Sequence, residues 1–87
     1  MTDELDAALI RLQYVAYTQR RTEPAVADDL EAVIRFASNR TDRRIDPMVI
    51  TRLEKRAVRA IEENQPTLAK DLAAAVELVG KLTVPKS

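Results

Sequence analysis

The chain has 87 residues, no cysteine and no histidine, and its 14 Lys and Arg residues balance 14 Asp and Glu residues. This length holds one domain at most. The composition excludes disulfides, thiol nucleophiles, histidine bases and metal sites built from thiolate or imidazole ligands, so we expect no metal, no cofactor and no enzyme. Zero net charge excludes a field strong enough to draw the whole chain onto nucleic acid or an anionic membrane.

The remaining composition favours an all-α protein with an aliphatic core. The chain has thirteen Ala and nine Leu residues, three aromatic residues and one Gly, which leaves little provision for tight β-hairpins. It contains no run of 18 apolar residues, and its first residues are acidic where a secretory signal is basic. We therefore expect a cytoplasmic protein with no membrane contact. Ten Arg against four Lys is typical of a GC-rich bacterial or phage genome.

Residues 3–20 are predicted to form the first helix, with acidic residues in its first turn, where the helix dipole favours them. At 100° per residue, six apolar side chains share one face: Leu5, Ala8, Leu9, Leu12, Val15 and Ala16. The second helix is predicted over residues 23–38, with Thr22 as N-cap and Pro24 in the first turn. Its apolar face, which has Phe36 at the edge, contains Val26, Leu30, Val33, Ile34 and Ala37. Residues 38–45 are polar and predict a loop.

The third helix is predicted to begin at Asp46 as N-cap and Pro47 as first residue, and to end before the Asn64-Gln65-Pro66 sequence. Its apolar face contains Val49, Ile50, Leu53, Ala57, Ala60 and Ile61. The fourth helix is predicted over residues 67–82, with Gly80 either ending it or lying inside it. Its apolar face contains Leu68, Leu72, Ala75, Val76, Val79 and Leu82.

These elements predict a single domain over residues 1–87, a small four-helix bundle with a flexible tail at 83–87. A domain of this size without disulfides or metals needs very good packing or self-association, and we expect a homodimer.

Basic residues gather on the third predicted helix and just before it. Six of them form a candidate partner-binding face: Arg43, Arg44, Arg52, Lys55, Arg56 and Arg59. Three interpretations stay open: a dock for an acidic protein surface, a contact for nucleic acid phosphates, or a face neutralised inside the fold. The neutralising residues would be Glu54, Glu62, Glu63 and acidic residues of the first and second predicted helices. If the face docks a partner, Arg52→Glu with Arg56→Glu is expected to remove binding and leave the melting temperature nearly unchanged.

Nucleic acid is the less favoured partner. About eight residues without Gly precede the basic helix, whereas a helix-turn-helix motif has a turn of three or four. The three aromatic residues do not supply a platform for stacking bases.

A second apolar stripe lies on the first predicted helix, nearly opposite its core face, and consists of Ile10, Tyr14 and Tyr17. Tyrosine combines an apolar ring with a polar tip, as interfaces favour. Three interpretations stay open: another helix of the chain covers the stripe, a foreign protein binds it, or a second copy binds it. An antiparallel pairing of two copies would bring Asp6 of one toward Arg21 of the other.

The sequence therefore predicts a non-catalytic helical binding protein, an adaptor, inhibitor or regulator that acts through protein–protein contacts. The alternatives are a nucleic-acid-associated protein and a structural subunit of a larger assembly. Acidic pairs such as Asp28-Asp29 and Glu62-Glu63 lie at predicted helix ends, where dipole and solvent explain them.

Overall fold

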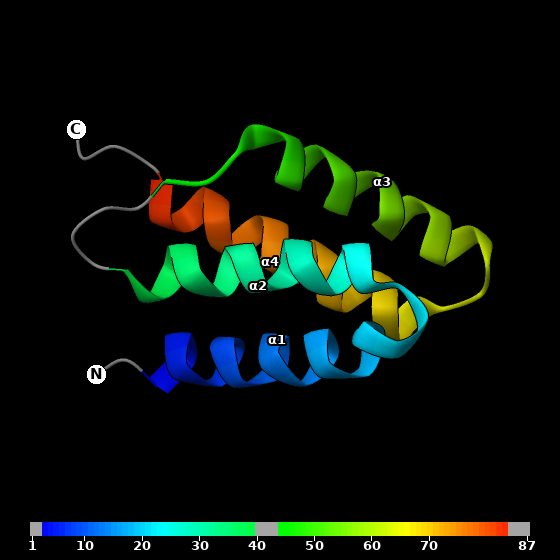
Figure 1. Ribbon diagram of the computed structural model, residues 1–87, viewed down its shortest axis with the longest axis horizontal. Coiled ribbons are helices and arrows are strands. Elements are labelled where there is room, and N and C mark those ends of the chain that lie inside the picture. Colours follow the sequence, from blue (N-terminus) through cyan, green and yellow to red (C-terminus); the bar gives the residue numbers. More distant parts are fainter. Residues whose placement is uncertain (1–2, 40–43, 84–87) are drawn as a thin grey trace.

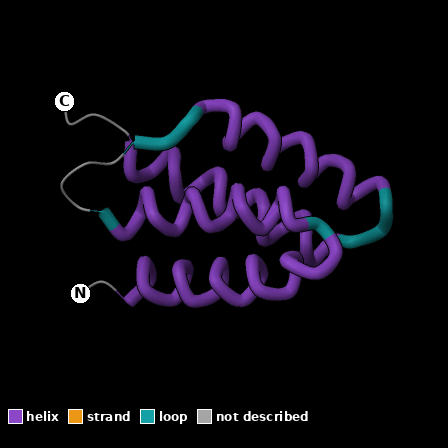
Figure 2. The backbone as a smooth tube through the Cα atoms, in the orientation of Figure 1, coloured by secondary structure: helices purple, strands orange, loops and turns teal. Residues whose placement is uncertain are grey.

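The computed structural model describes residues 3–39 and 44–83, which form four α-helices: α1 (Asp3–Thr22), α2 (Pro24–Ser38), α3 (Pro47–Glu62) and α4 (Pro66–Thr83). All regular secondary structure in this part of the chain is helical (Figure 2), which confirms the all-α prediction. Each observed helix end lies within two residues of its predicted position. Consecutive helices run in opposite directions, as short connections require (Figure 1).

The four helices form a bundle in which α2 and α4 are the central pair. The α1 helix packs against both of them on one side, and α3 packs against both on the other (Figure 1). Among the described residues, α1 and α3 do not contact each other. The bundle measures 39 × 22 × 19 Å. Its two outer helices therefore each keep a face that no other described helix covers.

The core is aliphatic, as predicted, and every helix contributes to it. The largest side chains that are fully buried are Leu30, Val33, Leu53 and Leu72. Two expectations about the apolar faces were wrong. Phe36 is 2% exposed and belongs to the core rather than its edge, whereas Ile61 is 67% exposed and does not belong to the core. Both residues lie near the end of their helix, where small differences in packing direction decide which side chains the neighbouring helix covers.

The helix starts show how local sequence sets the bounds. Asp46 caps α3 as predicted, and its Oδ1 accepts a hydrogen bond of 2.9 Å from the backbone N–H of Met48. Thr22 is not a cap, because α1 continues through it. Glu23 alone joins α1 to α2 and takes the cap position without a side-chain hydrogen bond to the helix. This one-residue connection folds α1 and α2 into a tight helical hairpin.

In the turn from α3 to α4, an asparagine takes the left-handed backbone conformation that glycine usually takes at the end of a helix. Asn64 takes a positive φ of 60°, a conformation that asparagine tolerates better than most residues. The N–H of Asn64 donates to the carbonyl of Ile61 at 3.1 Å, and that of Gln65 donates to the carbonyl of Ala60 at 2.7 Å. These two bonds are the Schellman pattern, with asparagine where glycine is usual.

Gly80 lies inside α4, three residues before its last residue, and a Cβ built on it would meet no atom within 4 Å. Since glycine loses more backbone entropy than alanine in a helix, Gly80→Ala is expected to stabilise the fold by about 0.5–1 kcal/mol. The exposed Ala73 of the same helix gives the reverse control, and Ala73→Gly is expected to cost about as much. Thermal unfolding of both variants checks the prediction, which a lower melting temperature for Gly80→Ala would contradict.

Thr83 is the last residue of α4, and the rest of the tail predicted at 83–87 lies outside the described residues. Within the described ranges, the chain has no helix that is both long and apolar enough to cross a membrane.

Candidate protein interaction surfaces

The stripe of Ile10, Tyr14 and Tyr17 lies on the side of α1 that faces away from the bundle, and we call it the α1 outer face. These side chains are 67%, 58% and 73% exposed, respectively. The opposite side of α1 packs into the core through Leu12 and Val15. No other described helix covers the α1 outer face, which excludes the first of the three interpretations of this stripe.

Shallow grooves flank the α1 outer face on both sides. Tyr14 borders a groove of about 280 Å³ between α1 and α4, which Leu68 and Asp71 also line. Tyr17 borders a groove of about 210 Å³ between α1 and α2, where Ile34 contributes an apolar wall. The two tyrosines therefore lean toward different neighbouring helices. A partner helix that packed along α1 would contact the apolar side chains of the α1 outer face, with one of these grooves on each side of them.

Arg11 holds Tyr14 and ties α1 to α4. Its guanidinium donates to both carboxylate oxygens of Asp71, from Nε at 3.1 Å and from Nη2 at 2.9 Å. The same guanidinium lies 5.2 Å from the centre of the Tyr14 ring, within the range of a cation–π contact. The Tyr14 ring therefore packs against a guanidinium that is already paired with Asp71, and this contact restricts the position of the ring.

Arginines of the candidate basic face make ion pairs inside the fold. Arg52 donates to both oxygens of Asp29 on α2, from Nε at 3.0 Å and from Nη2 at 2.8 Å. Arg59 donates from Nε to Glu63 at 2.9 Å, one turn along the chain. Bidentate arginine–carboxylate pairs are geometrically specific, and the Arg52 pair connects α3 to α2.

Arg56 makes the most buried of these pairs. Its Nε and Nη2 donate to the two oxygens of Glu23 at 2.8 and 2.6 Å, and Nη2 also donates to Oε1 of Gln65 at 3.3 Å. The Arg56 side chain is 11% exposed, and its Nη1 has no hydrogen-bond partner among the described residues. The bonds from Arg56 lower the pKa of the Glu23 carboxyl, and the bonds to Glu23 raise the pKa of Arg56. This pair fastens α3 to the joint between α1 and α2.

Three of the six proposed binding residues, Arg52, Arg56 and Arg59, therefore make ion pairs within the chain. Lys55 and Arg44 are exposed, and Arg43 lies outside the described residues. The interpretation that the fold neutralises this face is the one that the ion pairs support. They also reverse the expectation for Arg52→Glu with Arg56→Glu, because that variant would set carboxylates against Asp29 and Glu23 and lower the melting temperature.

One interpretation from the sequence was that Glu54, Glu62, Glu63 and acidic residues of the first two helices neutralise this face. The pairs made by Asp29, Glu23 and Glu63 agree with it. The explanation of Asp28-Asp29 by dipole and solvent was wrong for Asp29, whose carboxylate pairs with Arg52. Asp29 is 8% exposed, and a signal for it was present. It follows Val26 by three residues and precedes Val33 by four, so it shares the apolar face of α2. A carboxylate on an apolar face predicts a buried partner of opposite charge. Glu23 carried no such signal, since its role depends on the one-residue connection.

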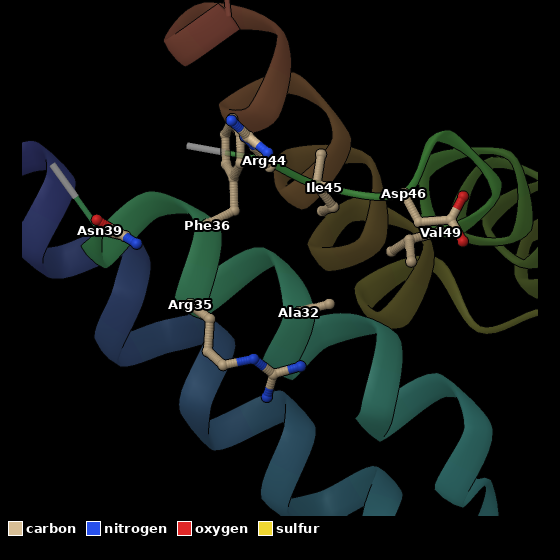
Figure 3. Close-up of a pocket in the computed structure, with 8 residues that line it drawn as sticks. All are labelled: Ala32, Arg35, Phe36, Asn39, Arg44, Ile45, Asp46 and Val49. Atoms are coloured by element: carbon tan, nitrogen blue, oxygen red, sulfur yellow. The ribbon is translucent and has the colours of Figure 1, made fainter. Parts of the chain in front are cut away.

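Arg44 borders an open groove of about 290 Å³ between α2 and the segment that leads into α3 (Figure 3). Its walls combine the apolar side chains of Phe36, Ile45 and Val49 with the polar side chains of Arg35 and Arg44. Asn39 and Arg44, the described residues on either side of the segment 40–43, both line this groove. Across residues 3–39 and 44–83, no three acidic side chains gather as metal ligands would.

The α3 helix also carries exposed apolar side chains. Val58 and Ile61, one turn apart, are 58% and 67% exposed. They lie on the helix that does not contact α1, on the far side of the bundle (Figure 1).

Comparison with known proteins gives no match to this chain among protein families, curated proteins or solved structures.

Proposed function

We propose that this chain is a non-catalytic helical binding protein that acts through protein–protein contacts, as an adaptor, inhibitor or regulator, with the α1 outer face as its contact surface. The observation that carries the proposal is the exposure of Ile10, Tyr14 and Tyr17 on a helix whose other side is packed in the core. Two tyrosines and an isoleucine side by side resemble the centre of a protein interface, which is rich in aromatic residues and poor in charge.

The basic face on α3 supports this choice of surface indirectly. Phosphates or an acidic protein would compete there with Asp29, Glu23 and Glu63, which already hold three arginines. Nucleic acid binding through α3 remains a hypothesis with weaker support for the same reason. In the part of the chain that the structure describes, no other helix covers the α1 outer face, and the Arg11 that contacts Tyr14 belongs to α1 itself.

The partner we propose for this face is a second copy of the chain, which makes the protein a homodimer. With zero net charge, two copies do not repel each other over long distances. Covering both stripes would also give this small domain the additional buried surface that it lacks as a monomer.

Size-exclusion chromatography with light scattering tests the homodimer. At tens of micromolar protein, we expect a mass of two 9.8 kDa chains. Tyr14→Glu with Tyr17→Glu is expected to give the mass of one chain, because it buries carboxylates in the contact. Val58→Glu with Ile61→Glu, at similarly exposed positions on α3, is the matched control and is expected to leave the dimer intact. A monomeric mass for the unaltered protein would contradict self-association.

A further inference from the structure

We infer that the two copies pair antiparallel along α1, about a twofold axis that runs between the two helices, perpendicular to both and level with the midpoint between Gln13 and Tyr14, so that each chain contributes half of a reciprocal set of contacts. This inference rests on the proposed homodimer and adds its geometry. It follows from three features of the α1 outer face: where its apolar side chains lie along the helix, which neighbouring helix each one leans toward, and where its charges lie.

The positions along the helix locate the axis. Ile10, Tyr14 and Tyr17 are centred between Gln13 and Tyr14, and an axis at that point covers the whole stripe of both copies. Ile10 and Tyr17 then lie equally far from the axis on opposite sides. In an antiparallel pair, Ile10 of each copy therefore faces Tyr17 of the other, and an aliphatic side chain packs against an aromatic ring.

The sides of the helix decide the contact at the axis. A twofold axis of this kind places the α4 side of one α1 helix beside the α4 side of the other. Tyr14 borders the groove on the α4 side, and it lies next to the axis. The Tyr14 rings of the two copies therefore meet each other, at the range where offset or edge-to-face aromatic pairs form. Arg11, paired with Asp71, supports each ring from its own chain.

The charges agree with the same placement. Asp6 and Arg21 are exposed and lie equally far from the axis, near the two ends of α1. The antiparallel arrangement brings Asp6 of each copy to Arg21 of the other, whereas a parallel arrangement would bring Asp6 to Asp6 and Arg21 to Arg21. Asp6 also lines a groove beside Ala37 of α2 within its own chain. With these two charges beyond the ends of the stripe, the surface of α1 is complementary to itself in the antiparallel direction and repulsive in the parallel one.

The available area is sufficient for a modest dimer. The 20 residues of α1 span about 30 Å. With its flanking grooves, the face is about as wide as the molecule, whose short dimensions are 22 and 19 Å. Contact over this whole side of the molecule would therefore cover at most about 600 Å² on each copy, at the low end of specific interfaces. We expect a dimer that dissociates on dilution.

Disulfide trapping tests the arrangement, and since the chain has no cysteine, each introduced thiol is unique. Tyr14→Cys is expected to cross-link to itself under mild oxidation. Ile10→Cys and Tyr17→Cys are each expected to cross-link poorly alone, because like positions lie about 10 Å apart along the helices, beyond disulfide reach. An equal mixture of these two variants is expected to form the mixed disulfide.

Val58→Cys is the control for random collision, since Val58 and Tyr14 are both 58% exposed. Tyr14→Cys is expected to cross-link at least about tenfold faster than this control, because dimerisation holds its two thiols together. Equal rates would overturn the inference. Self-cross-linking of Ile10→Cys and Tyr17→Cys, without the mixed product, would replace it with a parallel dimer and leave the proposed function standing. A monomeric unaltered protein would overturn both.

Charge reversal gives an independent readout. Arg21→Glu is expected to weaken dimerisation several-fold at low salt, because it sets two carboxylates against each other at each end of the contact, and the difference is expected to shrink at high salt. Asp6→Arg added to Arg21→Glu restores opposite charges and is expected to recover the affinity. A double variant as weak as the single one would overturn the placement of these charges.

Discussion

Leu53→Ala and Leu72→Ala are each expected to cost about 2–5 kcal/mol of unfolding free energy, and to leave much of the protein unfolded near physiological temperature. Both side chains are fully buried, on the two helices of the α3–α4 hairpin. Removing three carbons from such a site loses transfer free energy and leaves a cavity that the neighbours fill incompletely. A domain of this size has a total stability of about 4–13 kcal/mol, so either loss is a large share of it.

Chemical denaturation followed by far-UV circular dichroism measures these losses. Ile61→Ala is the matched control, because Ile61 lies on α3 but is 67% exposed, and its loss is expected to stay within about 0.5 kcal/mol. Losses below about 1 kcal/mol at both leucines would contradict the assignment of the core. A loss at Ile61 as large as the losses at the two leucines would contradict the assignment of Ile61 to the exposed side of α3.

Breaking the ion pair between Glu23 and Arg56 is expected to have the second largest effect. Glu23→Ala leaves the Arg56 guanidinium, 11% exposed, with the Glu63 carboxylate at 3.5 Å as its nearest counter-charge. Glu63 also pairs with Arg59, so it compensates the Arg56 charge only in part. We expect a loss of about 2–3 kcal/mol, less than for a fully buried pair because Glu23 is itself partly exposed. Glu23→Leu with Arg56→Met is expected to recover most of this loss, because the double variant buries no charge.

The same pair predicts how stability depends on pH. The pKa of Glu23 is lower in the folded state than its ordinary value of 4.5, because Arg56 stabilises the carboxylate. Its contribution is therefore complete above about pH 4.5 and is lost as the pH falls through the lower folded value. Denaturation midpoints measured from neutral to acidic pH are expected to fall more steeply for the unaltered protein than for Glu23→Ala. Parallel curves would contradict this contribution.

Arg59→Ala is the control for both measurements. Arg59 pairs with Glu63 one helical turn away, and its side chain is 67% exposed. Exposed pairs of this kind contribute about 0–1 kcal/mol, so we expect a small change in unfolding free energy. A loss as large as that of Glu23→Ala would mean that the whole arginine cluster is structural, rather than its buried member alone.

The sequence predicted the helices well because their signals are local. A Pro after a capping Asp marks the start of α3, and an apolar repeat at 100° per residue marks each buried face. The errors occur where tertiary contacts decide. Thr22 satisfies the local rule for a cap, yet α1 continues two residues beyond its predicted end and includes Thr22, and Glu23 takes the cap position of α2. Phe36 and Ile61 lie at the margins of apolar faces, where the neighbouring helix determines burial.

The candidate sites show the same difference between features set by local sequence and features set by tertiary contacts. The stripe of Ile10, Tyr14 and Tyr17 could be located from one helix alone, because it needs only the helical period, although its exposure could not. The basic cluster could be located but not interpreted, since its meaning depends on carboxylates from α2 and from the α1–α2 joint. The pairing of Arg56 with Glu23, 33 residues apart, has no signal in local sequence.

Because α1 and α3 lie on opposite sides of the bundle, a dimer formed through α1 would leave the α3 surface of each copy exposed, so that it has two identical surfaces available to a target. A pair that closes over α1 turns its two α3 helices to opposite ends of the assembly, each with Val58 and Ile61 exposed. In the proposed dimer these surfaces would lie about 40 Å apart, twice the cross-section of one bundle. A target with two sites at that spacing would engage both ends at once and gain avidity without any new contact, whereas a target with one site would not. Dissociation of the dimer on dilution would then remove the avidity while leaving each α3 surface unchanged.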